Sequence, residues 1–426
     1  MESMDYGNLF SGIDVPVRLK NGNYVVPINF DNAATTPSLK KVEEFIYENM
    51  HMYGSVGRGG QKSQYCTEAY EVSREEVLNF FGLSIEDGYE VIYVKNTTEG
   101  LNLLASGLCT TGRTKVLTTR MEHHANDLPW RFAARPYYCE VDIDNGMVKL
   151  EEIERRLVLG NSTIEYVTIT GASNVTGYVN KIHEIAKLVH RYGAKIIVDA
   201  AQLVAHREID IKGKAKDENI DFLVCSAHKM YAPFGSGVIV AKKELITNMY
   251  PMLQGGGAVS FVMDDDVYYK EQPYKDEAGT PNFLGVMALV AAMTVLKKVG
   301  FDNIYAHEKE LTDRVLNGLR DIKRVKLYGA ISRYDRLGVI PFNIEGINHH
   351  EVGNFLQDKR GIAVRTGCFC AQPYVRRLLK LDKEAQYEFL INPKLKEPGM
   401  VRASFGLYNT NEEVDEFLNV IESIKK

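Results

Sequence analysis

Residues 195–202 read Lys-Ile-Ile-Val-Asp-Ala-Ala-Gln, a short apolar run that ends in polar residues. β-Branched residues favour strands, and an apolar run without alternation is typical of a strand buried on both faces. Similar apolar runs occupy residues 91–94, 115–119, 164–170, 222–225 and 237–240, and helical patterns occupy residues 99–106, 150–157 and 182–192. The alternation predicts an α/β fold with a mostly parallel sheet covered by helices on both faces. The run 237–244 is predicted as its antiparallel or edge piece.

A second, smaller α/β region is predicted from about residue 300. Its elements are a helix at 305–319, a strand at 337–344, a helix at 350–359, a strand at 361–364 and a last helix at 412–424. The 426 residues also exceed what one typical core needs. We therefore predict an N-terminal segment 1–30 packed on the small domain, a large domain over 31–299 and a small domain over 300–426.

The composition excludes several classes of protein. Hydrophobic residues make up 45%, charged residues 25%, and the net charge is −5, which does not indicate a binder of nucleic acid or of membrane surfaces. The N-terminus lacks a signal-peptide pattern, and the apolar stretch 284–296 is short for a membrane span and predicts a core helix. Six cysteines without a Cys-x-x-Cys spacing favour neither disulfides nor a metal site, so we expect a reduced, cytoplasmic compartment.

Two polar residues follow neighbouring predicted strands and suggest a cofactor. Lys229 comes just after the apolar strand at 222–225, where partial burial favours the neutral amine that attacks carbonyl groups. Taken alone, Lys229 is better explained as a surface lysine, and Asp199, at the end of the strand 195–198, as a turn residue. Together they match pyridoxal phosphate, which needs a lysine for its aldehyde and a carboxylate for its ring nitrogen. Gln202 is then placed to bond the ring hydroxyl.

A phosphate site is predicted where residues 95–100 open a helix after a strand. Free backbone N–H groups and the helix dipole attract phosphate there, and Thr98 adds a hydroxyl, although the same residues also fit a capping box. Ser226 and His228 supply further candidate contacts. His123 either stacks on an aromatic ring or is a polar loop residue.

These residues lie in a series of motifs that runs through nearly the whole chain. In order they are DNAATTP (31–37), GRGG (57–60), TTEGLNLLA (97–105), MEHHANDLPW (121–130), SNVTG (173–177), VDAAQ (198–202), SAHKMYAPFGSG (226–237), QGGG (254–257), EAGTPN (277–282), GIAVRTG (361–367), RASFGLYNT (402–410) and EEVDEF (412–417). With them the chain resembles the class V aminotransferase group of pyridoxal-phosphate enzymes of fold type I. More narrowly, it resembles the short-loop group of the cysteine desulfurase and selenocysteine lyase family.

The resemblance implies a role for each matching residue. The large domain would bind the cofactor through Lys229, Asp199, Gln202, His123, Thr98, Ser226 and His228, with Thr280 supplied across a homodimer interface. Asn174, Arg365 and Arg402 would bind substrate, and the small domain would carry Arg402 and Cys370. Lys229, Cys370 and His123 are the expected catalytic residues.

The implied reaction converts L-cysteine to L-alanine and leaves the sulfur on Cys370 as a persulfide, from which an acceptor protein could take it. The attacking group is a thiolate, and Arg365 is a candidate source of stabilising positive charge. The alternatives are a related lyase, acting on selenocysteine or cysteine, an epimerase or aminotransferase without persulfide chemistry, and a scaffold that has lost catalysis.

Two features depart from the family pattern. Many members have a histidine where this chain has Cys368, and 31 residues separate Cys370 from Arg402. In an extended segment Cys368 and Cys370 would face the same side, so Cys368 could be a resolving thiol, although simple packing is the preferred interpretation. The extra piece, about residues 378–398, is predicted as a helix at 381–390 and a basic loop. It could cover the site or dock an acceptor, but a neutral surface insertion is preferred.

Overall fold

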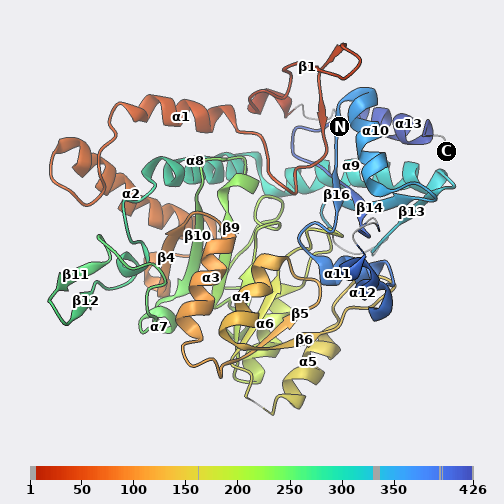
Figure 1. Cartoon of the computed structure of the whole chain (residues 1–426). Coiled ribbons are helices and arrows are strands. Elements are labelled where there is room, and N and C mark those ends of the chain that lie inside the picture. Colours follow the sequence, from red (N-terminus) through yellow and green to blue (C-terminus); the bar gives the residue numbers. More distant parts are fainter. Residues whose placement is uncertain (1–5, 162, 330–335, 393–394, 396, 425–426) are drawn as a thin grey trace.

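A seven-stranded sheet forms the centre of the larger part of the molecule (Figure 1). The computed structural model describes residues 6–161, 163–329, 336–392, 395 and 397–424. The strands are β4 (Tyr89–Val94), β5 (Lys115–Thr119), β6 (Arg135–Cys139), β7 (Tyr166–Thr170), β8 (Lys195–Asp199), β9 (Phe222–Ser226) and β10 (Gly237–Lys242), in the order β4-β10-β9-β8-β7-β5-β6. The neighbours from β9 through β6 pair in parallel, which confirms the predicted α/β fold.

Strand β10 is antiparallel to both β9 and β4, as predicted, but it is not at the edge. It lies between these two strands, and β4 and β6 are the edges of the sheet. Of the two predicted alternatives, the antiparallel one is confirmed and the edge one is not realised. The insertion of β10 between strands far apart in the chain depends on long-range pairing, which local patterns do not encode.

Both faces of the sheet are covered because alternate side chains of each strand point to opposite sides. Phe222 and Val224 pack in the core beneath α3 (Thr97–Leu108) and α4 (Leu128–Ala133), whereas Leu223 and Cys225 pack in the core on the other face. The elements α2 (Gln61–Phe80), α5 (Leu150–Leu159), α6 (Ile182–Arg191) and α8 (Phe283–Val299) contribute to that second core. The short helix α7 (Lys243–Ile246) follows β10, and α1 (Lys40–Met50) packs on α8.

Helix α8 is the core helix that the sequence predicted, with nine buried residues along its length. In the part of the chain that the structure describes, no single helix is long and apolar enough to cross a membrane. Helices α8 and α9 would be long and apolar enough only if they were taken as one span, and the chain bends by 79° between them.

The smaller part has its own sheet and its own core (Figure 1, right). The strands β13 (Val325–Leu327), β14 (Val339–Ile344), β17 (Met400–Ser404) and β16 (Arg365–Gly367) form the sheet in that order, and α9 (Phe301–Asp321), α10 (His349–Arg360) and α13 (Asn411–Glu422) complete the core. Near the N-terminus, β3 (Ile28–Asn29) pairs with β15 (Ile362–Ala363), and Ile28 and Phe30 are buried in this core. The exact division at 30 and 299 stays a prediction, and residues 1–5 lie outside the described part.

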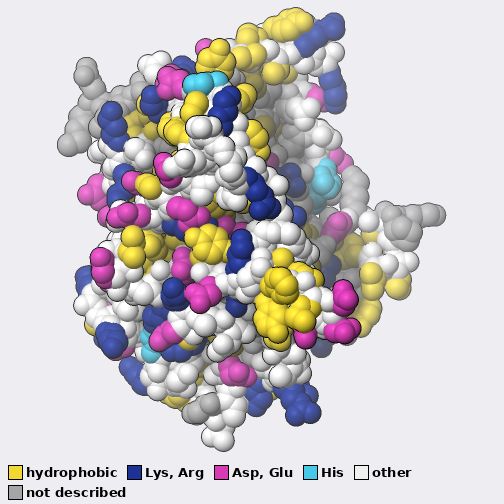
Figure 2. Space-filling view, turned by 90° about the vertical axis from the view of Figure 1, so that its left-hand side faces the viewer, with side chains coloured by type: hydrophobic (Ala, Val, Ile, Leu, Met, Phe, Trp, Pro, Cys, Tyr) yellow, Lys and Arg dark blue, Asp and Glu magenta, His cyan; other side chains and the backbone are white. Residues whose placement is uncertain are grey.

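Three further elements project from this framework. The segment after Cys370 forms α11 (Gln372–Leu378), and the insertion that follows forms α12 (Lys383–Ile391), close to the helix predicted at 381–390. Residues 393–394 and 396 of the predicted basic loop lie outside the described residues. A small hairpin of β1 (Val17–Arg18) and β2 (Tyr24–Val25) lies near the N-terminus. A second hairpin, β11 (Val259–Val262) and β12 (Val267–Tyr269), stands out from the large part, and Figure 2 shows hydrophobic side chains gathered on that face.

Candidate active site

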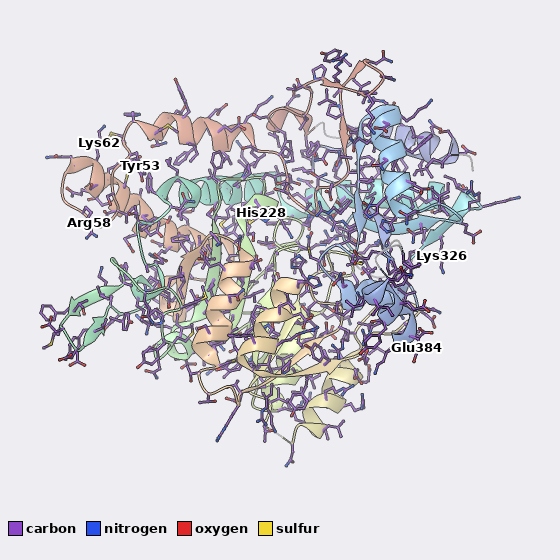
Figure 3. The ribbon with its side chains drawn as sticks, in the orientation of Figure 1. Tyr53, Arg58, Lys62, His228, Lys326 and Glu384 are labelled. Atoms are coloured by element: carbon purple, nitrogen blue, oxygen red, sulfur yellow. The ribbon has the colours of Figure 1, made fainter. Side chains whose placement is uncertain are left out.

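The predicted cofactor residues meet where the parallel strands end. Thr170, Asp199 and Ser226 close strands β7, β8 and β9, and parallel strands direct their carboxyl ends to one edge. A cavity of about 180 Å³ lies there. It is lined by Ala34, Asn96, Thr97, Thr98, His123, Ala125, Thr170, Asn174, Asp199, Ala201, Gln202, Ser226, His228 and Lys229. Figure 3 shows His228 near the middle of the molecule, between the large sheet and the smaller part.

Lys229 ends the short 3-10 helix η5 (Ala227–Lys229) directly after β9. The motif at residues 31–37 holds this turn, because the Thr36 N–H donates to the His228 carbonyl (3.1 Å) and the Thr36 hydroxyl accepts from the Tyr231 N–H (2.9 Å). No hydrogen bond or ion pair joins the Lys229 amine to another described residue. Burial lowers the pKa of Lys229 to about 8, against the opposing attraction of Asp199. The amine is therefore available as a nucleophile near neutral pH.

Asp199 is buried in the same cavity and forms no ion pair with another described residue. Its Oδ1 accepts the Ala201 N–H (3.0 Å). Burial raises the pKa of Asp199, while the Ala201 N–H and the charge of Lys229 act in the opposite direction. A buried carboxylate without a counter-charge is costly, so the site favours a ligand that brings a positively charged N–H group.

His123 and Gln202 lie beside these two groups. The His123 Nδ1 accepts the Ala125 N–H (3.1 Å), which leaves the ring to line the cavity. Burial, followed by the charges of Lys229, His124 and Arg402, lowers the pKa of His123 to about 3, so the ring is neutral. Gln202 donates to the Ala33 carbonyl (2.7 Å) through Nε2, which fixes its amide.

The start of helix α3 forms the far end of the cavity. Asn96 caps the helix by accepting the Glu99 N–H (3.0 Å), and the exposed Thr98 has no hydrogen-bond partner for its N–H or hydroxyl among the described residues. The Ser226 hydroxyl bonds both the Thr97 N–H and the Thr97 hydroxyl, each at 2.7 Å. Gly237 permits this close approach, because a Cβ there would lie 2.5 Å from the Cys225 carbonyl oxygen and 3.1 Å from the Cα of Asn96. A helix start with a free N–H suits phosphate.

His228 completes this end of the site. Its Nδ1 lies 3.1 Å from the Thr35 hydroxyl, and burial lowers the pKa of His228 to about 4. The Lys229 amine, the buried Asp199 carboxylate and the free start of α3 together fit pyridoxal phosphate. They match its aldehyde, its ring nitrogen and its phosphate, respectively.

Arg402 is buried beside the cavity and already has partners. Its Nη2 donates to Asp31 Oδ1 (2.8 Å), its Nη1 donates to the Asn174 carbonyl (2.9 Å), and its Nε has no partner in the described chain. The Asn174 side chain donates to the Phe369 carbonyl (2.7 Å). Arg365 is about half exposed, and its Nη1 lies 4.0 Å from the second Asp31 oxygen. Arg402 and Arg365 therefore both lie beside Asp31, and Asn174 joins this group through Arg402.

Cys370 is exposed and lines an adjoining cavity of about 850 Å³. Thr98, His123 and Ala125 line this cavity as well as the Lys229 cavity, so the two spaces adjoin. The structure thus brings the predicted nucleophile to the mouth of the predicted cofactor site, although it lies on a different part of the chain.

Cys368 does not share this position. Strand β16 ends at Gly367, and Phe369 and Cys370 both have φ in the left-handed region (53° and 54°), so the segment is not extended as the sequence suggested. The Cys368 thiol instead donates to the Pro398 carbonyl (3.1 Å). Burial, with Glu397 nearby, raises the pKa of Cys368 to about 11, which is unfavourable for a reactive thiolate.

Thr280 lies outside both cavities within the single chain. It is exposed and lines a separate cavity of about 240 Å³ together with Arg58, Glu277 and others. In Figure 3, Arg58 lies at the outer edge of the molecule, far from His228. The predicted role of Thr280 across a dimer interface stays a prediction.

Sequence reasoning did not assign Asp31, Thr97 or His124. Asp31 and His124 belong to the motifs at 31–37 and 121–130, so their motifs were the available signal. Their contacts join segments that are distant in the chain, and nothing in the sequence alone specifies those pairs.

Comparisons with known proteins identify the family. The family model described as aminotransferase class-V matches residues 28–417. A probable cysteine desulfurase of Halalkalibacterium halodurans is 34% identical, over 100% of this chain and 98% of the relative. One of Pyrococcus abyssi is 35% identical over 94% of each. The apo structure of cysteine desulfurase from Thermococcus onnurineus superposes with a TM-score of 0.81 at 33% identity, covering 93% of this chain and 94% of that one.

The chain therefore belongs to the aminotransferase class-V family of α/β enzymes. Within that family, the full-length relatives to which it is similar are cysteine desulfurases.

Proposed function

We propose that this chain is a pyridoxal-phosphate-dependent cysteine desulfurase, which converts L-cysteine to L-alanine and leaves the sulfur on Cys370 as a persulfide. The observation that carries the proposal is the adjacency of the Lys229 and Cys370 cavities, which have Thr98, His123 and Ala125 in common. This adjacency supports the proposal, because Lys229 would then act on the substrate α-carbon while the Cys370 thiol in the adjoining cavity reaches the substrate sulfur.

Lys229, Asp199, His123 and Gln202 would hold the ring of pyridoxal phosphate, and the start of α3 would hold its phosphate. When bound, the cofactor supplies an electron sink that stabilises negative charge at the substrate α-carbon. Lys229 would remove the α-proton, because its lowered pKa keeps a useful fraction of the amine neutral near pH 7.

Sulfur transfer needs no outside oxidant. The Cys370 thiolate attacks the substrate sulfur, a sulfur–sulfur bond forms, and the substrate carbon–sulfur bond breaks with its electron pair left on carbon. That carbon takes up a proton and becomes the methyl group of alanine. Carbon is reduced while the two sulfurs are oxidised to the persulfide level, so atoms and electrons balance.

Arg402 would hold the substrate carboxylate, since a guanidinium suits a carboxylate through two parallel hydrogen bonds. Asn174 supports it by accepting from Nη1 through its backbone carbonyl. Arg365, which lies on the exposed side of Asp31, is the second candidate for this carboxylate.

The test is to incubate the holoenzyme with L-cysteine and measure alanine, together with the mass of the Cys370 peptide after one turnover. The proposal expects alanine and a mass increase of one sulfur on Cys370. Cys370→Ser should abolish the persulfide and most alanine formation, and Lys229→Ala should abolish both together with the cofactor absorbance band. Full alanine formation by Cys370→Ser would instead favour a related lyase without persulfide chemistry.

We also propose that the enzyme is a homodimer. Five large hydrophobic side chains of the β11–β12 hairpin are exposed, namely Phe261, Val262, Met263, Val267 and Tyr268. Figure 2 shows hydrophobic side chains gathered on that face, and exposed patches of this kind suit protein contacts. The exposed Cys370 would also allow a sulfur-acceptor protein to approach.

A further inference from the structure

The backbone around Cys370 has an uncommon conformation. Phe369 and Cys370 are consecutive residues with side chains, and both have positive φ, 53° and 54°. Residues with a Cβ rarely adopt this region, and two in succession persist only where neighbouring groups hold them. The groups that hold this turn therefore decide where the thiol lies.

His124 makes two hydrogen bonds with the chain at and just after Cys370. Its backbone N–H donates to the Cys370 carbonyl (2.7 Å), and its ring Nε2 accepts the Gln372 N–H (3.2 Å). Nε2 accepts only when the ring is neutral with its proton on Nδ1. Burial lowers the pKa of His124, with the charges of Arg131 and Arg376 acting in the same direction and Asp127 opposing, so the neutral ring is the stable form.

The loop that carries His124 is firmly anchored. His124 begins the 3-10 helix η3 (His124–Asn126), and the buried Asn126 side chain bonds Glu122 (2.6 Å), Trp130 (3.1 Å) and Thr168 (2.6 Å). Glu122 in turn accepts from the Thr119 hydroxyl at the end of β5 (2.5 Å). The central sheet therefore supports this loop, on which His123 faces the cofactor cavity and His124 contacts the Cys370 segment.

Two other contacts hold the same segment to the large domain. The Phe369 carbonyl accepts from Asn174 (2.7 Å), and the Tyr374 hydroxyl donates to the Gly146 carbonyl (2.7 Å). His124 differs from these two residues because it bonds the segment twice, through a main-chain contact to the Cys370 carbonyl and a ring contact from the Gln372 N–H.

We propose that His124 is a positioning residue for sulfur transfer, which fixes the turn at Cys370 so that the thiol faces the mouth of the cofactor cavity. The proposal rests on the proposed function. His124 acts through the backbone of residues 370 and 372 and is not itself required to touch substrate.

The test compares two substitutions in the holoenzyme. His124→Phe keeps a flat ring but removes the acceptor, whereas His124→Gln keeps an acceptor near the position of Nε2. A displaced nucleophile loses rate steeply, so His124→Phe should slow first-turnover persulfide formation on Cys370 by about tenfold or more, with the KM for L-cysteine changed less than about twofold. His124→Gln should recover most of that rate. His350→Phe is the matched control, because His350 is an exposed histidine that bonds only the Thr366 side chain by its ring.

A second measurement does not depend on activity. Hydrogen–deuterium exchange of the Gln372 amide should be faster in His124→Phe than in wild type and restored in His124→Gln. Unchanged exchange, or an unchanged persulfide rate in His124→Phe, would overturn the positioning role. If wild type itself forms no persulfide on Cys370, the proposed function fails, and that result is separate from the exchange result.

Discussion

Arg402 Nη2 donates to Asp31 Oδ1 at 2.8 Å, across 371 residues of sequence. The guanidinium proposed to bind the substrate carboxylate is thus paired with a carboxylate of the protein before substrate arrives. Asp31 is partly exposed and has the half-exposed Arg365 4.0 Å away on its other oxygen. Substrate can therefore replace Asp31 on Arg402, while Asp31 retains a second cation nearby.

Asp31→Asn should lower the KM for L-cysteine, because a neutral amide competes less strongly for Arg402. A partly exposed ion pair contributes about 1 kcal/mol, which corresponds to about fivefold in KM. Steady-state kinetics checks this, with Asp358→Asn as the control, since Asp358 pairs with the exposed Lys20. A KM that rises instead would mean that Asp31 holds Arg402 in its binding position.

Arg402→Lys should raise the KM for L-cysteine by about tenfold or more, because an ammonium group cannot hold the substrate carboxylate in two parallel bonds. The Asp31 carboxylate would also lose one fixed partner. Steady-state kinetics with L-cysteine measures the change. An unchanged KM would show that another residue, with Arg365 as the first candidate, binds the carboxylate.

The capture of pyridoxal phosphate by the cofactor-free enzyme should depend on the neutral amine of Lys229. Burial lowers the pKa of Lys229 to about 8, so the rate of covalent capture should rise about tenfold per pH unit below that value and level off above it. In the unfolded chain Lys229 keeps its proton up to the ordinary lysine pKa, so the folded chain loses this proton at a lower pH than the unfolded chain does. Between about pH 8 and 10, this group therefore makes the folded apoenzyme more stable as pH rises. Absorbance after rapid mixing and melting temperature measure the two effects, and a flat rate from pH 6 to 9 would contradict the assignment.

Cys368→Ala should retain persulfide formation on Cys370. The Cys368 thiol donates to the Pro398 carbonyl and is partly buried, so its loss removes one hydrogen bond, about 1 kcal/mol of stability. Mass spectrometry of the Cys370 peptide and a thermal melt test both statements. Loss of all persulfide with Cys370 intact would make Cys368 a participant in the chemistry.

The dimer proposal predicts complementation between two inactive variants. Lys229→Ala lacks the amine, and Thr280→Glu would place a negative charge against the phosphate of the partner's cofactor. If the subunits exchange at random, half of the dimers are heterodimers. Each heterodimer has one intact site, which combines Lys229 of one chain with Thr280 of the other, so about a quarter of wild-type activity should return. No recovery after subunit exchange, or a monomer in sedimentation, would contradict the proposal. Thr163→Glu serves as the control, because Thr163 is exposed and its hydroxyl accepts from Lys115.

Much of the fold was predictable because buried parallel strands are continuous apolar runs. Lys229 and Asp199 could be paired from sequence since the ends of adjacent parallel strands share one edge of the sheet. The interior place of β10 could not be predicted, because strand order depends on pairing between distant segments. The orientation of Cys368 was likewise set by the two left-handed residues that follow it, which the extended pattern did not reveal.

The sequence by itself determined the α/β class, the amine and carboxylate of the cofactor site, and the family, because these follow from local periodicity and from short ordered motifs. Only the tertiary structure decided that Asp31 occupies Arg402 and that His124 holds the turn at Cys370. Both contacts join segments more than 200 residues apart, and such pairs form only when the folded chain brings the segments together. Phe369 and Tyr374, on either side of Cys370, pack in the core of the large sheet, and Val401, beside Arg402, packs in the core of the small one.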